Sequence, residues 1–279
     1  MSAVLPDRAQ AVIIGGGIHG CSVAYHLAKA GWSDVILLER NQLTSGTTWH
    51  AAGLVAQLRA SQNMTRLSSY STELFAELAR QTGQETGYQQ TGSMTLALNP
   101  ERLEELKRQA TMANAFGVEC EVVDESFVQA QWPGIQTHDL CGGVYLSGDG
   151  QTNPVDTTLA LAKGARSNGA QIFEDTKVAR LAIENGQAVG VYLDDGTLIN
   201  AKQVVLAGGM WSREFAAQHD IHLPLHAAEH FYLVTEPLES FTAMRPTLRV
   251  PDEQIYLSLI HISEPTRPER IWYGVFWVK

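Results

Sequence analysis

The sequence predicts an α/β fold in which a Rossmann-like unit at the N-terminus is joined to a second domain built on a mixed or antiparallel sheet. A glycine-rich turn separates an apolar strand candidate from a helix-forming run within the first 38 residues, as in a βαβ unit. Later strand candidates follow one another without regular crossover helices, which is typical of antiparallel pairing. With 279 residues and 44% apolar side chains, the chain is long enough to bury two cores.

The βαβ unit is predicted from three consecutive segments. Residues 11–14 form an apolar, β-branched run that suits a strand buried on both faces. Residues 18–30 are good helix formers, and Gly31 supplies a C-terminal stop. Residues 34–38 return as a second buried strand.

The later elements are predicted from periodicity and turn residues. Helices are expected over residues 65–81, 101–116 and 154–168. One face of the first of these helices is expected to hold Tyr70, Leu74, Phe75 and Leu78. Strands are expected over residues 93–98, 143–146, 203–206 and 231–235. Asn185-Gly186 and Asp195-Gly196 predict hairpin turns between three short strands, and residues 207–209 form a second glycine-containing loop.

The composition of the chain argues against several classes of function. A net charge of -10 without any Lys/Arg cluster argues against a nucleic-acid surface. The three cysteines, Cys21, Cys120 and Cys141, lack metal-ligand spacing and are odd in number, so we expect no metal and three buried free thiols in a reducing compartment. The first ten residues hold no targeting signal, and no apolar run of about 18 residues could span a bilayer. A cytoplasmic protein is expected.

Gly15, Gly17 and Gly20 form a G-x-G-x-x-G pattern at the start of the first helix. The first glycine permits the turn, the second lets a pyrophosphate approach the backbone, and the third lets helix and strand pack closely. Glu39 ends the next strand, where a carboxylate can accept ribose hydroxyls. Such a loop can merely turn the chain, but strand, helix and acidic residue together favour dinucleotide binding. FAD and NAD both remain open, because both carry an ADP half.

The following segment, residues 43–54, is rich in small and hydroxyl residues and holds one Trp-His pair. A histidine taken alone is more often structural than catalytic. From about residue 11 to residue 256, however, the chain resembles the dimethylglycine and sarcosine dehydrogenase family, within the D-amino-acid-oxidase-like flavoproteins. The most specific motif is Thr48-Trp49-His50-Ala51-Ala52-Gly53, whose histidine carries FAD through an 8α-histidyl bond in that family. The resemblance implies that His50 is the catalytic residue, covalently bonded to FAD.

The same resemblance implies the remainder of the cofactor site. Ile18 and His19 are expected at the pyrophosphate, and Glu39 and Arg40 at the adenosine ribose. The expected cofactor-binding residues are Gly15, Gly17, Ile18, His19, Gly20, Glu39, Arg40, Gly46, Thr47, Thr48, Trp49, His50, Ala51, Ala52, Gly53, Leu54, Val178 and Trp211. Residues 207–209 read Ala-Gly-Gly where the family often has Ala-Ala-Gly, a small change that removes bulk.

The chemistry implied by the resemblance is oxidative demethylation of sarcosine or dimethylglycine, which yields formaldehyde and the demethylated amine. An electron-transfer flavoprotein is the implied acceptor, and folate is implied for a full-length protein only. Eukaryotic relatives are expected in the mitochondrial matrix. Three alternatives stay open: a non-catalytic regulatory relative, which has no need of a covalent flavin anchor at His50, an oxygen-using amino-acid oxidase, and an NAD-dependent dehydrogenase, which the motif at 48–53 disfavours.

The sequence gives weaker signals for the residues that bind the substrate. Arg59 and Arg66 follow the expected flavin-lining segment and are candidates for binding a substrate carboxylate, or are solvated surface charges. Residues 226–232 place histidines and aromatics at the start of a strand, where they face either a pocket or a core.

The resemblance also implies a discontinuous organisation. The FAD-binding domain is expected to take residues 1–92 and 147–215, and the substrate domain residues 93–146 and 216–256. From Leu257 the sequence departs from the family: residues 257–267 read LSLIHISEPTR, which resembles a translated transposase sequencing adapter. Residues 257–279 are therefore expected to be a non-native tail. The fold is expected to be truncated at the C-terminus, and the chain to fold poorly and turn over little.

Overall fold

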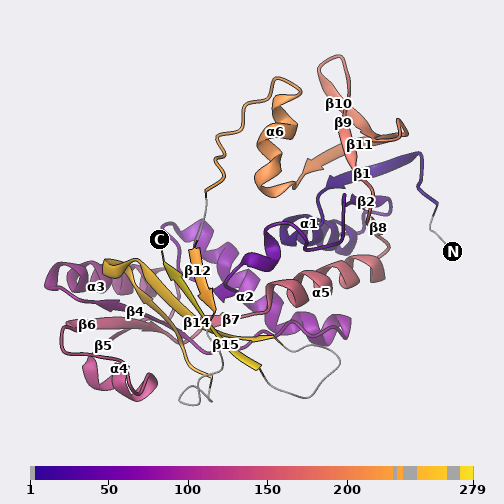
Figure 1. Ribbon diagram of the computed structural model, residues 1–279. Coiled ribbons are helices and arrows are strands. Elements are labelled where there is room, and N and C mark those ends of the chain that lie inside the picture. The colour runs from indigo at the N-terminus through magenta and orange to yellow at the C-terminus, as the bar shows by residue number, and fades with distance from the viewer. Residues whose placement is uncertain (1–3, 229–230, 235–243, 263–270, 279) are drawn as a thin grey trace. The chain divides into compact units, whose positions relative to one another are not determined.

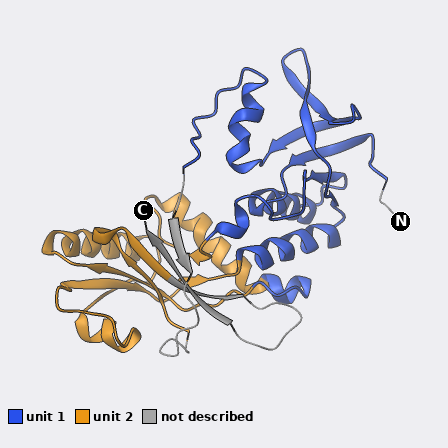
Figure 2. Cartoon of the chain, in the orientation of Figure 1, with its two compact units in different colours: residues 1–51, 78–86, 154–228 blue, residues 52–77, 87–153, 229–279 orange. Residues whose placement is uncertain are grey.

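A computed structural model describes residues 4–228, 231–234, 244–262 and 271–278 (Figure 1). Its contacts divide the chain into two compact units, drawn in different colours in Figure 2. The first unit comprises Met1–Ala51, Leu78–Thr86 and Pro154–Ala228. The second comprises Ala52–Glu77, Gly87–Asn153 and Glu229–Lys279. Each unit therefore takes several separate pieces of the chain.

The first unit is built on a six-stranded sheet in the order β8-β2-β1-β11-β10-β9. Its strands are β1 (Arg8–Ile14), β2 (Val35–Leu38), β8 (Gln171–Phe173), β9 (Val178–Glu184), β10 (Gln187–Leu193) and β11 (Leu198–Leu206). β1 pairs in parallel with both β2 and β11, and β2 with β8, whereas β9, β10 and β11 pair antiparallel. The predicted βαβ unit and the two predicted hairpins are confirmed.

Three helices of the first unit pack against this sheet. They are α1 (Ile18–Lys29), α5 (Pro154–Ser167) and the short α6 (Ser212–Ala217). α1 and α5 pack against each other (Figure 1). Small residues permit the close approach, since a Cβ on Gly164 of α5 would lie 2.8 Å from the Tyr25 ring of α1. A second core lies among Val12, Ile36 and Val191, with Phe215 of α6 packed against it.

The second unit is built on a mixed seven-stranded sheet in the order β12-β15-β14-β13-β4-β6-β5. Its strands are β4 (Ser93–Ala97), β5 (Glu121–Val123), β6 (Gly142–Leu146), β12 (Phe231–Val234), β13 (Thr247–Val250), β14 (Ile255–Ile262) and β15 (Ile271–Val278). One core packs against α3 (Pro100–Ala115), around Leu106 and Ala110, and another against α4 (Glu125–Gln131), around Val128. The predicted mixed sheet is confirmed.

The compact units differ from the expected domain ranges over residues 52–77, 87–92, 147–153 and 216–228. Ala52–Glu77 belongs to the second unit, because β3 (Leu54–Val55) pairs with β7 (Gly150–Gln151) and Leu58 packs into the α3 core. Residues 216–228 belong to the first unit, because His219, just after α6, accepts the Leu181 N–H of β9 at 3.0 Å. Helical periodicity shows which face is buried, but it does not show against which core.

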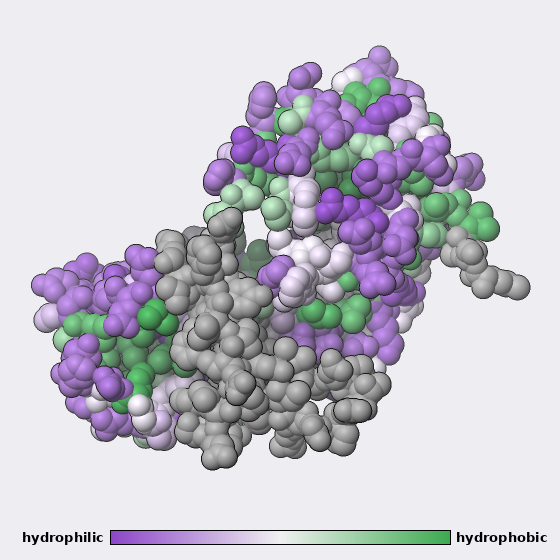
Figure 3. Space-filling view, in the orientation of Figure 1, coloured by the Kyte–Doolittle hydropathy of each residue, from purple (hydrophilic) through white to green (hydrophobic). Residues whose placement is uncertain are grey.

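Two burial predictions need correction. In α2 (Gln62–Thr82), Leu74 and Leu78 are buried as predicted, but Tyr70 on the same predicted face is 41% exposed. Cys21 and Cys120 are buried free thiols, whereas Cys141 is exposed. Cys141 lies just outside β6, whose first three residues are buried. Hydrophilic side chains cover much of the described surface seen in Figure 3.

The segment expected to be a non-native tail is drawn as a hairpin. β14 and β15 pair antiparallel, from Ile255 opposite Val278 to Ile262 opposite Ile271, and β14 also pairs with β13. The non-native origin of residues 257–279 stays a prediction. Among the described residues, no helix is long and apolar enough to cross a membrane.

Candidate cofactor site

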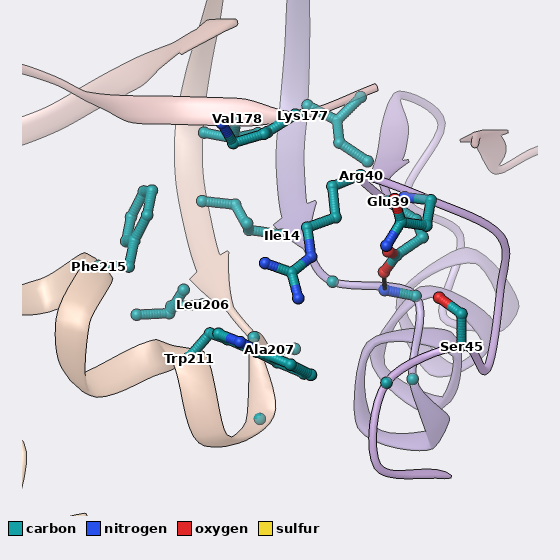
Figure 4. Close-up of a pocket in the computed structure, with 18 of the residues that line it drawn as sticks. Ile14, Glu39, Arg40, Ser45, Lys177, Val178, Leu206, Ala207, Trp211 and Phe215 are labelled. Carbon is teal, nitrogen blue, oxygen red and sulfur yellow. Dashed lines mark hydrogen bonds between the residues drawn. The ribbon is translucent and has the colours of Figure 1, made fainter. Parts of the chain in front are cut away.

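A cavity of about 550 Å³ lies in the first unit at the carboxyl ends of β1, β2 and β11 (Figure 4). Ligands of open α/β sheets bind at such a strand edge, and the volume falls in the range of small-molecule sites. The start of α1, the loop around residues 45–51 and α6 complete the lining. The cavity is therefore placed and sized for a nucleotide-type ligand.

The glycine pattern has the geometry that its sequence predicts. Gly15 has a φ of +112°, and a Cβ there would collide with the Ala207 carbonyl group. A Cβ on Gly20 would collide with the Gly15 carbonyl oxygen, so Gly20 permits the close packing of α1 on the turn. A Cβ on Gly17 would lie 3.0 Å from Thr48 Oγ1. Only glycine permits this turn beside the cavity.

The backbone donors of the turn are largely engaged already. The Gly15 N–H donates to the Leu38 carbonyl oxygen at 2.9 Å, and the Ile18 N–H donates to Thr48 Oγ1 at 3.1 Å. In the part of the chain that the structure describes, the N–H groups of Gly17 and His19 donate to no protein acceptor. Both residues line the cavity, at the positive end of α1. An anionic ligand would meet these two free donors.

Glu39 and Arg40 enter the cavity from the end of β2 (Figure 4). Glu39 Oε2 accepts the Gly16 N–H at 2.6 Å, and Oε1 accepts the Asn41 N–H at 3.0 Å. Each carboxylate oxygen keeps a further lone pair for a ligand hydroxyl. The Arg40 guanidinium lies over the Trp211 ring, 4.2 Å from its centroid. The predicted ribose pair and the predicted aromatic residue thus meet at one cavity.

The opposite end of the cavity is apolar. Ile14, Val178, Leu206 and Phe215 surround it, as Figure 4 shows. Such a wall suits a flat, weakly polar ring such as adenine. Lys177 and Asp194 also line the cavity, with Nζ and Oδ2 2.9 Å apart. Sequence reasoning missed Phe215, Lys177 and Asp194 as lining residues, although Lys177 adjoins the predicted Val178.

The predicted flavin-lining segment is only partly at this cavity. Gly46, Thr47, Thr48 and Ala51 line it, together with Gly15, Gly17, Ile18 and His19. The residues expected at the cofactor that do not line it are Gly20, Trp49, His50, Ala52, Gly53 and Leu54. Ala52, Gly53 and Leu54 belong to the second unit. The cavity therefore brings together only part of the predicted cofactor site.

His50 lies at the end of a short 3-10 helix, η1 (Thr48–His50), and is exposed. Its ring stacks on Trp49, with centroids 3.5 Å apart and planes tilted by 33°. Thr48, at the start of the same helix, is buried and bonded to the N-terminus of α1. An anchored turn thus carries an accessible imidazole that is not among the residues lining the cavity.

The substrate candidates remain scattered. Arg59 is exposed and donates from Nη1 to the Leu58 carbonyl oxygen at 2.9 Å, and Arg66 is exposed on α2. Of the segment at 226–232, His226 is exposed, and residues 229–230 lie outside the described residues. Among described residues, no group of three or more His, Cys, Asp or Glu side chains could hold a metal ion.

Asp149 is a buried carboxylate of the second unit that sequence reasoning missed. Its oxygens accept the Gln57 N–H at 2.8 Å and the Ser93 hydroxyl at 2.6 Å. Burial raises the pKa of Asp149, and these two bonds lower it by less. No local pattern marks the residue, because its partners lie far away in sequence.

The model of the "FAD dependent oxidoreductase" (DAO) family matches residues 10–275. The chain belongs to this family of flavoproteins. The match passes Tyr256, where the resemblance was expected to stop, and runs into the segment expected to be non-native.

Several curated relatives align with most of the chain. The chain is 39% identical to the mouse mitochondrial pyruvate dehydrogenase phosphatase regulatory subunit (92% of this chain, 29% of the relative). It is 37% identical to 4-methylaminobutanoate oxidase (formaldehyde-forming) of Paenarthrobacter nicotinovorans (91% and 31%) and 38% identical to human mitochondrial sarcosine dehydrogenase (92% and 28%). The chain thus spans less than a third of the length of these relatives.

Solved structures share the fold. L-proline dehydrogenase from P. horikoshii superposes with a TM-score of 0.85 at 25% identity, covering 97% of this chain and 70% of that one. Glycine oxidase from Bacillus cereus superposes with a TM-score of 0.71 at 25% identity, covering 97% and 71%. The chain therefore has the fold of the FAD dependent oxidoreductase (DAO) family, as the matches to these two structures show.

Proposed function

We propose that this protein is an FAD-dependent dehydrogenase that demethylates an N-methyl amino acid of the sarcosine or dimethylglycine kind, with the flavin bonded covalently to His50. The observation that carries this proposal is the η1 turn. Thr48 joins the cavity that suits an adenine dinucleotide, and two residues later His50 presents an accessible ring. The names of two relatives, a sarcosine dehydrogenase and a formaldehyde-forming 4-methylaminobutanoate oxidase, support the substrate class.

The residues of the first unit fit FAD. The glycine turn offers the Gly17 and His19 N–H groups to a diphosphate, and Glu39 keeps lone pairs for ribose hydroxyls. The apolar wall around Val178 and Phe215 fits adenine. Bound FAD would accept a hydride from the substrate methyl carbon. The task of these residues is to hold and orient the cofactor, while water hydrolyses the oxidised amine to formaldehyde and the demethylated amine.

The electron acceptor and the fate of formaldehyde are part of the proposal. We expect an electron-transfer flavoprotein as acceptor. Folate is expected to capture the one-carbon unit in a full-length protein only. The relatives are about three times longer than the aligned segment, which leaves room for a further domain in such a protein.

A second candidate is a non-catalytic regulatory relative. The observation that favours it is the 39% identity to a phosphatase regulatory subunit, as high as the identity to the dehydrogenase. Such a protein would use the same fold for binding without turnover.

Flavin reduction by substrate separates the two candidates. The full-length protein is mixed anaerobically with sarcosine or dimethylglycine, and the visible flavin absorbance is followed together with formaldehyde release. The dehydrogenase loses absorbance with either amine and releases formaldehyde, and glycine, which has no methyl group to give, serves as the control. Flavin that neither amine reduces would contradict the proposal and favour the regulatory relative.

A further inference from the structure

A histidine joins two elements that line the cavity of the first unit. Phe215 lines the cavity from α6, and Val178 lines it from β9 (Figure 4). His219, in the turn that follows α6, accepts the Leu181 N–H of β9 through Nε2 at 3.0 Å. The His219 ring also contacts the Phe215 ring, with centroids 5.8 Å apart. This hydrogen bond, the α6–β9 link, therefore connects α6 to β9 beside the apolar end of the cavity.

Only a neutral imidazole can make the α6–β9 link. A backbone N–H is always a donor, so Nε2 of His219 must offer its lone pair while Nδ1 carries the ring proton. Protonation of Nε2 would turn the acceptor into a donor and set two N–H groups against each other. Histidine is the side chain that ordinarily makes this change between about pH 5 and pH 8. Acid is therefore expected to break the link.

The charges around His219 do not replace the lost hydrogen bond. In the part of the chain that the structure describes, His219 forms no ion pair with a carboxylate. The charged or titratable side chains of the elements around it are Arg213, Glu214 and Asp220 in and after α6, Arg180 and Glu184 on β9, Tyr192 on β10 and Lys202 on β11. All but Tyr192 are exposed, and Arg180 lies over the Tyr192 ring at 3.7 Å. Because solvent screens exposed charges, the hydrogen bond decides the effect of protonation.

The helix α6 depends on contacts of this kind. It has six residues, too few for a helix to be stable without tertiary contacts. Phe215 attaches it to the sheet by packing against the core around Val191, and the α6–β9 link attaches the turn at its end. Gln218, next to His219 in that turn, lines the cavity. Breaking the link would therefore loosen a segment of the cavity wall.

We propose that His219 makes the cavity of the first unit sensitive to pH. The neutral ring fastens the end of α6 to β9, and protonation of the ring releases it and weakens the binding of a nucleotide against the apolar wall. The effect on binding rests on the proposed cofactor site. The release of α6 does not depend on what the cavity holds, so the two parts are tested separately.

The link is tested by amide hydrogen exchange in the full-length protein, followed by mass spectrometry in peptides that contain Leu181. Protection is expressed relative to the intrinsic chemical exchange rate, which itself changes with pH. From about pH 8 to about pH 5, the protection of the Leu181 N–H is expected to fall by about tenfold or more. The N–H groups of β1, which pairs with strands on both sides, should keep their protection and show that the unit stays folded.

His219→Gln separates protonation of this ring from other effects of acid, because the amide oxygen of glutamine accepts a hydrogen bond at every pH in this range. In this variant the protection of the Leu181 N–H should change by less than about twofold. His222→Ala removes a nearby exposed histidine and should retain the native loss of protection. Unchanged protection in the native protein, or an equal fall in His219→Gln, would overturn the inference.

The effect on binding is tested with ADP as the probe, by calorimetric titration of the full-length His50→Ala protein freed of flavin. The phosphate groups of ADP also titrate in this range, so each affinity is compared with that of the same protein carrying His219→Gln at the same pH. The two proteins should bind ADP equally at about pH 8, and the protein that keeps His219 should bind it about threefold or more weakly at about pH 5. Equal affinities at both values would overturn the effect on binding. Failure to bind ADP at either value would overturn the proposed cofactor site, while the exchange measurement would still decide whether His219 releases α6.

Discussion

Glu39 and Gly16 are joined by a 2.6 Å hydrogen bond from the Gly16 N–H to Glu39 Oε2. Because the Asn41 N–H donates to the other oxygen, Glu39 ties the end of β2 to the glycine turn before any ligand is present. We expect Glu39→Ala to lower the free energy of unfolding by about 1–3 kcal/mol, since it leaves the partly buried Gly16 N–H without its charged acceptor. Urea unfolding measures the change. Glu184→Ala, at an exposed position of the same unit, should change it by less than about 0.5 kcal/mol, and equal effects would contradict the account.

Gly20→Ala tests the packing of α1 on the turn. The added methyl group would collide with the Gly15 carbonyl oxygen, a backbone atom that cannot turn aside. We expect a loss of more than about 2 kcal/mol in unfolding free energy. Gly31→Ala is the comparison, because its added Cβ meets nothing within 4 Å and its cost comes only from a φ of +88°, about 1–2 kcal/mol. A Gly20→Ala protein as stable as Gly31→Ala would show that the turn is looser than described.

The cysteines should react in a fixed order. Burial raises the pKa of Cys21 to about 12 and that of Cys120 to about 11, while Cys141 is exposed. Only the thiolate reacts, so at neutral pH an alkylating reagent should label Cys141 first and the other two only after unfolding. Peptide mass spectrometry follows the labelling. Early labelling of Cys21 would contradict the burial of α1.

The raised pKa of Cys21 also predicts the direction in which the free energy of unfolding changes with pH. Above the ordinary thiol pKa of 9.0 the unfolded chain loses this proton, whereas the folded chain keeps it up to about 12. The unfolded state then binds fewer protons, so stability falls as pH rises between these values. Cys21→Ala should flatten that part of the unfolding profile, and an unchanged slope would speak against it.

Asp149 offers a prediction in the second unit. Asp149→Ala leaves the Gln57 N–H and the Ser93 hydroxyl without their acceptor, and we expect it to lower the free energy of unfolding by about 2–4 kcal/mol. Because burial raises the pKa of Asp149, ionisation of this carboxyl opposes folding. Its contribution to the free energy of unfolding should therefore rise as pH falls through the acid range. Chemical unfolding at several pH values measures both. Asp139→Ala, at an exposed position, should be near neutral.

Local sequence patterns were enough to predict the βαβ unit. They did not predict contacts between segments that lie far apart in the sequence. Gly15, Gly17 and Gly20 predicted the turn because each has a steric reason that five or six residues reveal. The contact of Arg40 with Trp211 joins segments 171 positions apart, and nothing near either residue indicates it. The same limit explains why Asp149 was missed and why Ala52–Glu77 was assigned to the other domain.

The measurement that tests the central claim most directly is flavin fluorescence in the protein band after acid denaturation and gel electrophoresis. Covalent FAD at His50 predicts a fluorescent band that disappears in His50→Ala and persists in His222→Ala, where another exposed histidine of the first unit is removed. A dark band from folded, flavin-loaded native protein, or a fluorescent band that survives His50→Ala, would contradict the claim.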